Sequence, residues 1–407
     1  MHVTVWGINY APELTGIAPY NRALCEHLQK AGHEVRMVTT FSYYPAWKKT
    51  ESDRGRLFRT DVINGVKVFR CWHYVPRRVT TLRRIVHEAT FITTTFLRLL
   101  ALPRPDIYVV VSPPLLLGLA ARCMQILRSR PYVFHVQDLQ PDAAVGLGML
   151  KPSAFTRLLY HLEALAYRHA AAVSGIGQGM LQAFTRKGIP ATRQIYFPNG
   201  ATLPAKNDLP PRGKFRARHG FKAEEFLAIY SGNLGVKQGL DILMEAAKQL
   251  DGTSVRIVIC GDGAVRPKLE ACIQLEKLRN VTLLPLQPDR EYQEMLADAD
   301  VCLVTQQAGS GAAFLPSKLL TVLALARPVV GVADKTSALR SAIAEGGFGI
   351  CVQPGDAKNL SQVLPALADN RAELEQYGSN GRKYVEQFAF DKVLPRFTAD
   401  LEKLLKK

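Results

Sequence analysis

The sequence predicts two α/β domains of similar size, each a doubly wound parallel sheet with helices on both faces. The chain has 407 residues, which is long for a single domain. Short, continuously apolar runs alternate with helix-length segments along almost all of it, as expected for parallel strands buried on both faces. The alternation stops once, in a stretch rich in Pro, Gly and Asn at 198–215, and then restarts.

Seven apolar runs in the first half are expected to be strands. They cover 2–8, 34–40, 66–72, 106–112, 131–138, 171–177 and 193–200, with helices expected at 18–30 and 115–128. Together they form a first domain at 1–200.

The second half repeats this rhythm. Strands are expected at 226–232, 254–261, 281–286, 300–306, 328–333 and 349–355, and helices at 240–250, 264–277 and 317–325. The second domain spans 201–390, and an amphipathic helix at 391–407 is expected to cross back to the first. Two such domains facing a cleft would bind ligands at the carboxyl ends of their strands.

The net charge of +17 lies mostly in the first half. Residues 1–200 carry 25 Lys and Arg against 11 Asp and Glu, whereas residues 201–407 carry 27 against 24. This asymmetry indicates a partner surface, with nucleic acid and anionic lipid as the candidates. Seven scattered cysteines without a C-x-x-C pair, and the lack of a secretory segment before the first strand, favour the reducing cytoplasm.

The segment 75–104 holds six arginines and one acidic residue. Its arginines cluster at one end, at Arg77, Arg78, Arg83 and Arg84, ahead of an apolar, threonine-rich helix that is too polar to span a bilayer. We expect it to lie on the inner face of the cytoplasmic membrane, with Phe91, Ile92, Phe96 and Leu97 toward the acyl chains. The alternative is a core helix with a solvated basic end. Nucleic acid is not expected, because stacking aromatic residues are not interleaved with the charges.

Four loops have the composition of phosphate-binding turns. Gly16 stands between the first strand and the first helix, where it allows close approach to the backbone or simply makes a tight connection. The segments 230–247 and 259–270 each run from a strand through a Gly-rich turn to a helix start, and the first carries Lys237. In the segment 306–331, Ser317 is expected to cap a helix, and Lys318 is either a phosphate ligand or a solvated lysine.

These segments, taken in order with HVQDLQPDAA, FPNGA and PSKLLTVLALARPVV, resemble the family 4 retaining glycosyltransferases over residues 1–390. The bacterial exopolysaccharide branch with colanic acid fucosyltransferases is the most similar. The resemblance implies the GT-B fold of two Rossmann-like domains. It also implies transfer of a sugar, with fucose from GDP-fucose as the best guess, from a nucleoside diphosphate donor to a polyprenyl-diphosphate-linked saccharide.

The resemblance also implies roles for particular residues. Catalytic roles fall on Lys237, Lys318, His135 and Asp138, the two lysines on the departing diphosphate; His135 has a structural alternative, and Asp142 is a weaker candidate. The donor-binding residues implied are Gly16, Gly232, Asn233, Gly261, Asp262, Gly263, Ser317 and Thr321. No cofactor or metal is expected, and the Asp-x-Asp at 298–300 is expected to be structural.

The sequence departs from the family pattern at the ribose site. The two acidic residues of the family's Glu-x7-Glu motif correspond to Ala313 and Thr321, and its paired Arg and Lys correspond to Asn233 and Gln238. Two alternatives therefore stay open: a nucleotide-sugar epimerase of the same fold, and a non-catalytic protein that holds lipid-linked intermediates.

Overall fold

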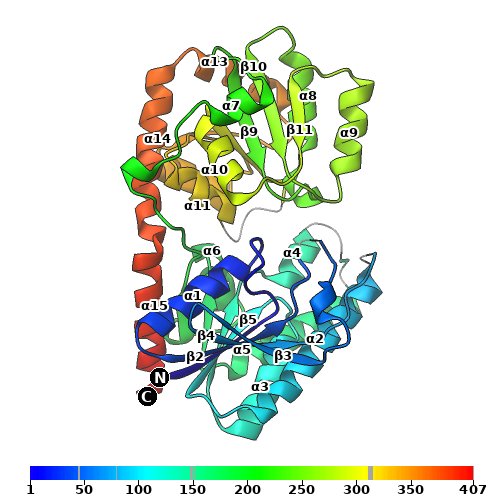
Figure 1. Ribbon diagram of the computed structural model, residues 1–407, viewed down its shortest axis with the longest axis vertical. Coiled ribbons are helices and arrows are strands. Elements are labelled where there is room, and N and C mark those ends of the chain that lie inside the picture. Colours follow the sequence, from blue (N-terminus) through cyan, green and yellow to red (C-terminus); the bar gives the residue numbers. More distant parts are fainter. Residues whose placement is uncertain (45, 79, 147–149, 152, 310–314, 407) are drawn as a thin grey trace. The chain divides into compact units, whose positions relative to one another are not determined.

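The computed structural model describes residues 1–44, 46–78, 80–146, 150–151, 153–309 and 315–406. The chain forms two compact units, both drawn in Figure 1. Unit 1 contains residues 1–199 together with 390–407, and unit 2 contains residues 200–389. Ala313, where the family pattern has an acidic residue, lies outside the described residues.

Unit 1 is a mostly parallel sheet with the strand order β3-β4-β2-β1-β5-β6-β7-β8. The strands are β1 (His2–Gly7), β2 (Glu34–Thr40), β3 (Phe58–Ile63), β4 (Val66–Cys71), β5 (Ile107–Ser112), β6 (Tyr132–Val136), β7 (Ala172–Gly175) and β8 (Gln194–Tyr196). The helices are α1 (Ala18–Lys30), α2 (Thr81–Ala101), α3 (Leu117–Arg128), α4 (Gln140–Gly146), α5 (Ala154–His169), α6 (Gln178–Arg186) and α15 (Phe390–Leu405).

One edge of this sheet was not expected from the sequence. β3 pairs with β4 in the antiparallel sense, and the two strands are joined by Asn64 and Gly65, both with positive φ. Asn-Gly between two strands is the composition of a tight hairpin turn, so the signal was present in the sequence.

Helix α15 returns to unit 1 and completes its core. Val393, Phe397 and Leu401 are buried against the same cluster as Val3 and Leu24. The ring of Phe397 also stacks on that of Phe197 with centroids 3.9 Å apart. The amphipathic pattern at the end of the chain therefore reflects burial of one helix face in unit 1.

Unit 2 is a fully parallel six-stranded sheet with the order β11-β10-β9-β12-β13-β14. The strands are β9 (Phe226–Ser231), β10 (Val255–Cys260), β11 (Val281–Leu284), β12 (Val301–Thr305), β13 (Val329–Val332) and β14 (Gly349–Val352). The helices are α7 (Lys214–His219), α8 (Asp241–Gln249), α9 (Arg266–Leu275), α10 (Asp289–Asp298), α11 (Ser317–Ala324), α12 (Ala338–Gly346), α13 (Ala357–Ala368) and α14 (Arg371–Val385).

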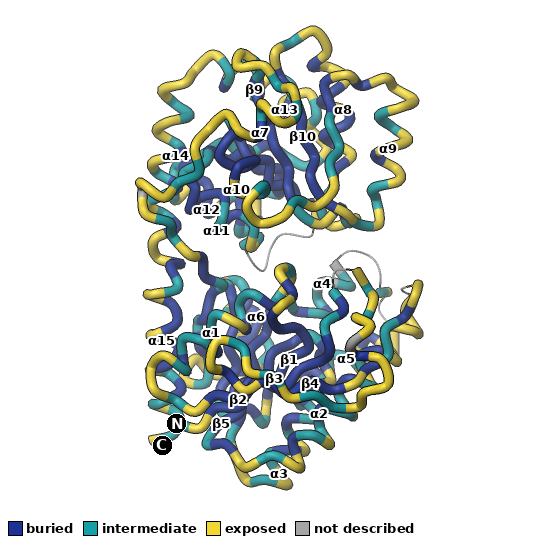
Figure 2. The backbone as a smooth tube through the Cα atoms, viewed as in Figure 1, coloured by how far each residue is buried: buried dark blue, intermediate teal, exposed yellow. Residues whose placement is uncertain are grey.

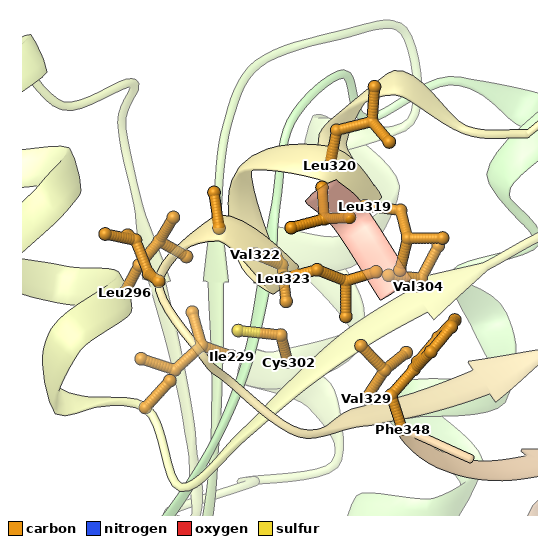
Figure 3. Packing of buried hydrophobic residues seen from close by; sticks show 14 of the residues in the cluster. Ile229, Leu296, Cys302, Val304, Leu319, Leu320, Val322, Leu323, Val329 and Phe348 are labelled. Atoms are coloured by element: carbon orange, nitrogen blue, oxygen red, sulfur yellow. The ribbon is translucent and has the colours of Figure 1, made fainter. Parts of the chain in front are cut away.

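Helix α11 is fixed by its apolar side chains. Leu319, Val322 and Leu323 are buried in one cluster with Cys302 and Val304 of β12, as Figure 3 shows. Because this cluster holds the helix against the sheet, the first turn of α11 has a defined position beside the ends of the strands.

The Asp-x-Asp motif is part of the scaffold, as expected. Asp298 is buried and accepts hydrogen bonds from the backbone N–H groups of Gly213 and Arg216, at the start of α7. Asp300 accepts hydrogen bonds from the backbone of Leu227 and from the Arg216 guanidinium. Both carboxylates are therefore engaged in tying α7 to the sheet.

Candidate active site

Two Gly-rich turns of unit 2 bond to each other at the carboxyl ends of β9 and β10. The N–H of Gly232 donates to the carbonyl of Cys260 (2.9 Å), and the N–H of Leu234 donates to that of Asp262 (2.8 Å). The N–H of Val265 donates back to the carbonyl of Leu234 (2.9 Å). The two turns that sequence analysis treated separately are thus one backbone unit.

This arrangement requires glycine at two positions. A Cβ on Gly261 would lie 1.9 Å from the Gly232 carbonyl oxygen, and one on Gly263 would lie 2.5 Å from the Leu234 oxygen. No side chain tolerates such distances to a backbone atom. Glycine is therefore required at both positions because backbone packs directly on backbone there, with or without a bound ligand.

The polar side chains of the turns lie at the surface. Asn233 is exposed, and its amide oxygen is 2.7 Å from the position of a Cβ on Gly263. Asp262 is exposed and accepts a hydrogen bond from the N–H of Gly263 (2.8 Å). Both are placed to meet a ligand beyond the strand ends.

Lys318, in the first turn of α11, lies against β9 and its turn. Its Nζ is 3.6 Å from the centroid of the Tyr230 ring, and its Cδ is 3.8 Å from the position of a Cβ on Gly232. The Nζ is buried and has no hydrogen-bond partner among the described residues. Burial lowers the pKa of Lys318 to about 7.

A buried ammonium without a hydrogen bond is unfavourable unless something else compensates it. The Tyr230 ring supplies a partial compensation through its negative face. An anionic group beside the turn would supply the rest.

The expected cap by Ser317 is wrong. Pro316 occupies the N-cap position of α11, Ser317 is the first helical residue, and no side chain caps the helix. Ser317 is exposed. Ser317 lies one position too late to act as the N-cap, and because proline has no side-chain acceptor, no side chain of the described residues caps the first N–H groups of α11. Thr321 follows Lys318 by three residues, so the two share one face of α11.

Lys237 lies in the turn between β9 and α8. It is exposed, and its backbone carbonyl accepts a hydrogen bond from the N–H of Gln307 (2.8 Å), just after β12. The loops that follow β9 and β12 are therefore joined. β9 and β12 are neighbours in the sheet, and the strands that follow each of them in the chain are added on opposite sides of this pair. Doubly wound sheets bind their ligands at such a reversal of strand order.

In unit 1, Gly16 stands in the loop between β1 and α1. It is exposed with φ of +67°, a conformation that favours glycine, and a Cβ there would be 3.6 Å from the Tyr44 ring. β1 and β5 are also neighbours at a reversal of strand order, so Gly16 lies at the corresponding point of the first sheet.

Both ring nitrogens of His135 are hydrogen-bonded within unit 1. It is buried at the end of β6, its Nδ1 bonds with the Ser174 hydroxyl (2.8 Å), and its Nε2 accepts from the Gln137 amide (2.8 Å). Burial lowers the pKa of His135 to about 3, so the ring is neutral. Because both ring nitrogens are already bonded within the protein, these contacts favour the structural alternative for His135, and its catalytic role stays a prediction.

The same amide of Gln137 also donates to Asn199 (3.0 Å). The network therefore fixes two amide side chains at the carboxyl edge of the unit 1 sheet. Neither Gln137 nor Asn199 was predicted as a site residue. The only signal in the sequence was that each follows a strand. Sequence analysis missed Tyr230 as well, whose position directly before the Ser-Gly-Asn turn was the available signal.

The two aspartates of the loop after β6 differ in their surroundings. Asp138 is half-buried directly after Gln137, on the edge described above. Asp142 forms an ion pair with Lys187 (2.7 Å), which also bonds with the buried Glu163. This weaker candidate thus belongs to an ionic contact among α4, α5 and the end of α6.

The four clustered arginines lie at and before the start of α2. Arg77, Arg78, Arg83 and Arg84 are all exposed, and Arg84 pairs with Glu88 (3.1 Å). Among the described residues, no helix has the length and apolar character needed to cross a membrane.

Comparison with known proteins decides the family. Residues 15–200 match a family described as a glycosyl transferase 4-like domain, and residues 211–384 match one described as glycosyl transferases group 1. WcaI of Escherichia coli K12, named as a colanic acid biosynthesis glycosyl transferase, is 32% identical over 412 residues, which cover 98% of this chain and all of WcaI. This chain belongs to the family 4 glycosyltransferases.

Solved structures with the same fold agree with this assignment. Sucrose-phosphate synthase from Thermosynechococcus elongatus has a TM-score of 0.78 at 18% identity, with 99% of each chain covered. HepE of Anabaena, solved in complex with UDP, has a TM-score of 0.71 at 15% identity, with 99% of this chain and all of HepE covered. The glycosyltransferase therefore has the GT-B fold expected from its sequence.

Proposed function

We propose that this glycosyltransferase moves a sugar, with retention at the anomeric carbon, from a nucleoside diphosphate donor to a polyprenyl-diphosphate-linked saccharide. The similarity to WcaI favours exopolysaccharide biosynthesis, with GDP-fucose as the donor tested first. The observation that carries the proposal is the buried Nζ of Lys318, which has no hydrogen-bond partner within the described part of the chain and lies beside the interlocked Gly-rich turns.

The diphosphate would bind at the carboxyl ends of β9 and β12. Lys318 and Lys237 would take its negative charge, together with backbone N–H groups at the starts of α8, α9 and α11. Negative charge on the diphosphate increases as its bond to the sugar breaks, so fixed positive groups there lower the barrier. We propose that the enzyme needs no metal or cofactor, since these groups perform the task of a cation.

The nucleoside would be held without the family's acidic pair. Thr321 lies one helical turn from Lys318 on the same face, and its hydroxyl is our candidate for the ribose. Gly232, Asn233 and the turn 261–263 would line the rest of the donor site. A neutral hydroxyl in place of a carboxylate predicts weaker ribose binding than a Glu would give.

Unit 1 would hold the acceptor and meet the transferred sugar. Gly16 leaves the backbone after β1 open to close approach, and Asp138 stands at the carboxyl edge of the same sheet. A lipid-linked acceptor also requires the enzyme to work at a bilayer. We propose that Arg77, Arg78, Arg83 and Arg84 bind phosphates on the inner face of the cytoplasmic membrane.

The test is release of free nucleoside diphosphate from a panel of UDP- and GDP-sugars, with and without lipid-linked acceptor. Release that depends on the acceptor, together with a product that retains the anomeric configuration, supports the proposal. Conversion of the nucleotide sugar without acceptor would show an epimerase. Calorimetry that detects no binding of any nucleotide sugar would indicate a non-catalytic holder of lipid-linked intermediates.

A further inference from the structure

Glu13 is a buried carboxylate in the loop between β1 and α1, three residues before Gly16. It is 7% exposed. A carboxylate loses its hydration on burial, which is unfavourable unless other groups bind it. Glu13 takes no part in the proposed donor site of unit 2, so the groups that bind it indicate what it does.

The carboxylate of Glu13 accepts hydrogen bonds from two loops. Its Oε1 accepts from the backbone N–H groups of Tyr43 (2.8 Å) and Tyr44 (2.9 Å), in the loop after β2. Its Oε2 accepts from the side-chain amide of Asn9 (2.8 Å), in the loop after β1. All three groups donate to the carboxyl, so the ionised form fits this site. One side chain therefore joins the two loops, which both follow buried strands of the sheet (Figure 2).

Another buried charge holds the first part of the loop after β1. The Arg70 guanidinium donates to the carbonyl of Ala11 and to that of Thr40 at the end of β2 (3.1 Å). In the stretch 12–17, the side-chain hydrogen bonds within the described structure are those of Glu13. The carboxylate therefore attaches the later part of this loop, which ends in the glycine, to the rest of unit 1.

The loop after β2 enters the core through Tyr43. Its buried ring makes T-shaped contacts with the imidazole rings of His73, just after β4, and of His87 in α2, with centroids 4.9 and 4.8 Å apart. Phe91 is buried on the same face of α2, one turn after His87, so the expectation that Phe91 contacts lipid is wrong. The sequence did not show this because exposed positions of α2 are apolar as well. Tyr43 is thus a fixed partner for the carboxylate.

The two joined loops meet at Gly16 and Tyr44. A Cβ on Gly16 would lie 3.6 Å from the Tyr44 ring, which is ordinary van der Waals contact. Because Glu13 holds the N–H of Tyr44 and belongs to the loop of Gly16, it sets the distance between this ring and the glycine backbone. Loss of the carboxylate would allow the two loops to shift relative to each other.

We infer that Glu13 is a positioning residue for sugar transfer, which keeps the backbone of Gly16 in place beside the reacting sugar. It acts through Gly16 and Tyr44 and does not itself touch the reacting atoms. This inference rests on the proposed function, since it needs a reaction beside Gly16. A buried charge often stabilises a fold no more than an apolar side chain would, so a role in geometry explains Glu13 better than a role in stability. Misplacement of reacting groups by about 1 Å can reduce a rate about 10²-fold.

The test compares two variants of the full chain. Glu13→Gln keeps the size of the side chain but has one acceptor oxygen instead of two, and Glu13→Ala has none. At saturating donor and acceptor, kcat per folded molecule should fall about tenfold in Glu13→Gln and about 10²-fold in Glu13→Ala. The affinity for UDP or GDP, measured by calorimetry, should stay close to that of the parent, because the proposed diphosphate site lies in unit 2. A residue that only stabilised the fold would leave kcat per folded molecule unchanged.

Glu163→Gln is the matched control. Glu163 is another buried carboxylate of unit 1, and it binds the Tyr167 hydroxyl (2.9 Å) and Lys187. This variant should lose stability but keep the turnover of the parent per folded molecule. An equal loss of turnover in Glu163→Gln would overturn the inference, since removal of any buried carboxylate would then have the same effect.

Hydrogen exchange at the amides of Tyr43 and Tyr44 provides a second readout. Exchange should be faster in Glu13→Gln and unchanged in Glu163→Gln, because only the first variant removes an acceptor from these N–H groups. Unchanged exchange in Glu13→Gln, or parental turnover in both Glu13 variants, would overturn the inference alone. A parent that shows no acceptor-dependent release of nucleoside diphosphate would overturn the proposed function together with this role, so the two failures are distinguishable.

Discussion

The Nζ of Lys318 lies 3.6 Å from the centroid of the Tyr230 ring, buried and without a hydrogen-bond partner among the described residues. The two residues come from α11 and β9, and each is fixed by the core beneath it. This relationship sets a cation at the edge of the sheet where the proposed diphosphate binds.

Replacing Lys318 by Ala should lower kcat by about 10²- to 10³-fold, since the leaving diphosphate would lose a fixed positive group. The measurement is release of nucleoside diphosphate under saturating donor and acceptor. Lys248→Ala is the matched control, because Lys248 is a unit 2 lysine paired with Glu245 away from the turns. Turnover close to that of the parent in Lys318→Ala would remove this lysine from the mechanism.

The affinity for nucleoside diphosphate should fall as the pH rises above 7. Burial lowers the pKa of Lys318 from 10.5 to about 7, so above that pH the free enzyme must take up a proton to present a charged lysine to the ligand. Affinity for UDP or GDP should then fall by up to about tenfold per pH unit, and calorimetry in buffers of different ionisation enthalpy should detect proton uptake. Lys318→Arg should bind without this dependence.

The lowered pKa of Lys318 should also make the stability of the unliganded protein depend on pH. Between pH 7 and 10.5 the unfolded chain keeps a proton on Lys318 that the folded chain lacks, so the free energy of unfolding rises with pH across this window and falls as the pH returns toward 7. Urea titrations at several pH values should show this trend in the parent and not in Lys318→Met. Identical pH dependence of the two proteins would contradict the shifted pKa.

Gly261→Ala should lower the free energy of unfolding by about 2 kcal/mol or more, because the new Cβ would meet the Gly232 carbonyl oxygen. Gly252→Ala is the comparison. Its Cβ would have no neighbour within 4 Å, so only its φ of +75° opposes the change, at about 1 kcal/mol. Thermal melts of both variants rank the two effects, and equal losses would argue against the interlocked turns.

His135→Ala should reduce stability by about 2–4 kcal/mol, since it leaves a cavity and removes the partner of Ser174 and Gln137. Its turnover per folded molecule should change by less than the 10²-fold or more that loss of a general base causes. Activity should be measured at a temperature where the variant is fully folded. A loss of that larger size in folded protein would restore the catalytic interpretation.

Continuous apolar runs were sufficient to predict the parallel strands of both sheets, because strands buried on two faces leave no polar gaps. The edge strand β3 was missed because its exposed residues alternate with half-buried ones, and only Asn64 and Gly65 pointed to it. The sequence placed the domain boundary at residue 200 and the start of the returning helix at residue 391. Both positions lie within one residue of the boundaries between the two units.

The site was predicted as a set of loops, not as a set of contacts. Its Gly-rich turns are visible in the sequence because backbone packing excludes every other residue there. That Lys318 is buried over Tyr230, and that His135 is satisfied by Ser174, depends on side chains 88 and 39 positions apart in the chain. Such pairings are set by the packing of α11 and β7, which no local pattern encodes.

The return of α15 to unit 1 has a consequence for synthesis of the protein. Residues 1–199 precede unit 2 in the chain, yet the surface that receives Val393, Phe397 and Leu401 stays uncovered until helix α15 has left the ribosome. A nascent chain thus exposes apolar side chains around Val3 and Leu24 while all of unit 2 is being translated, and exposed apolar surface of this kind is where aggregation starts and chaperones bind.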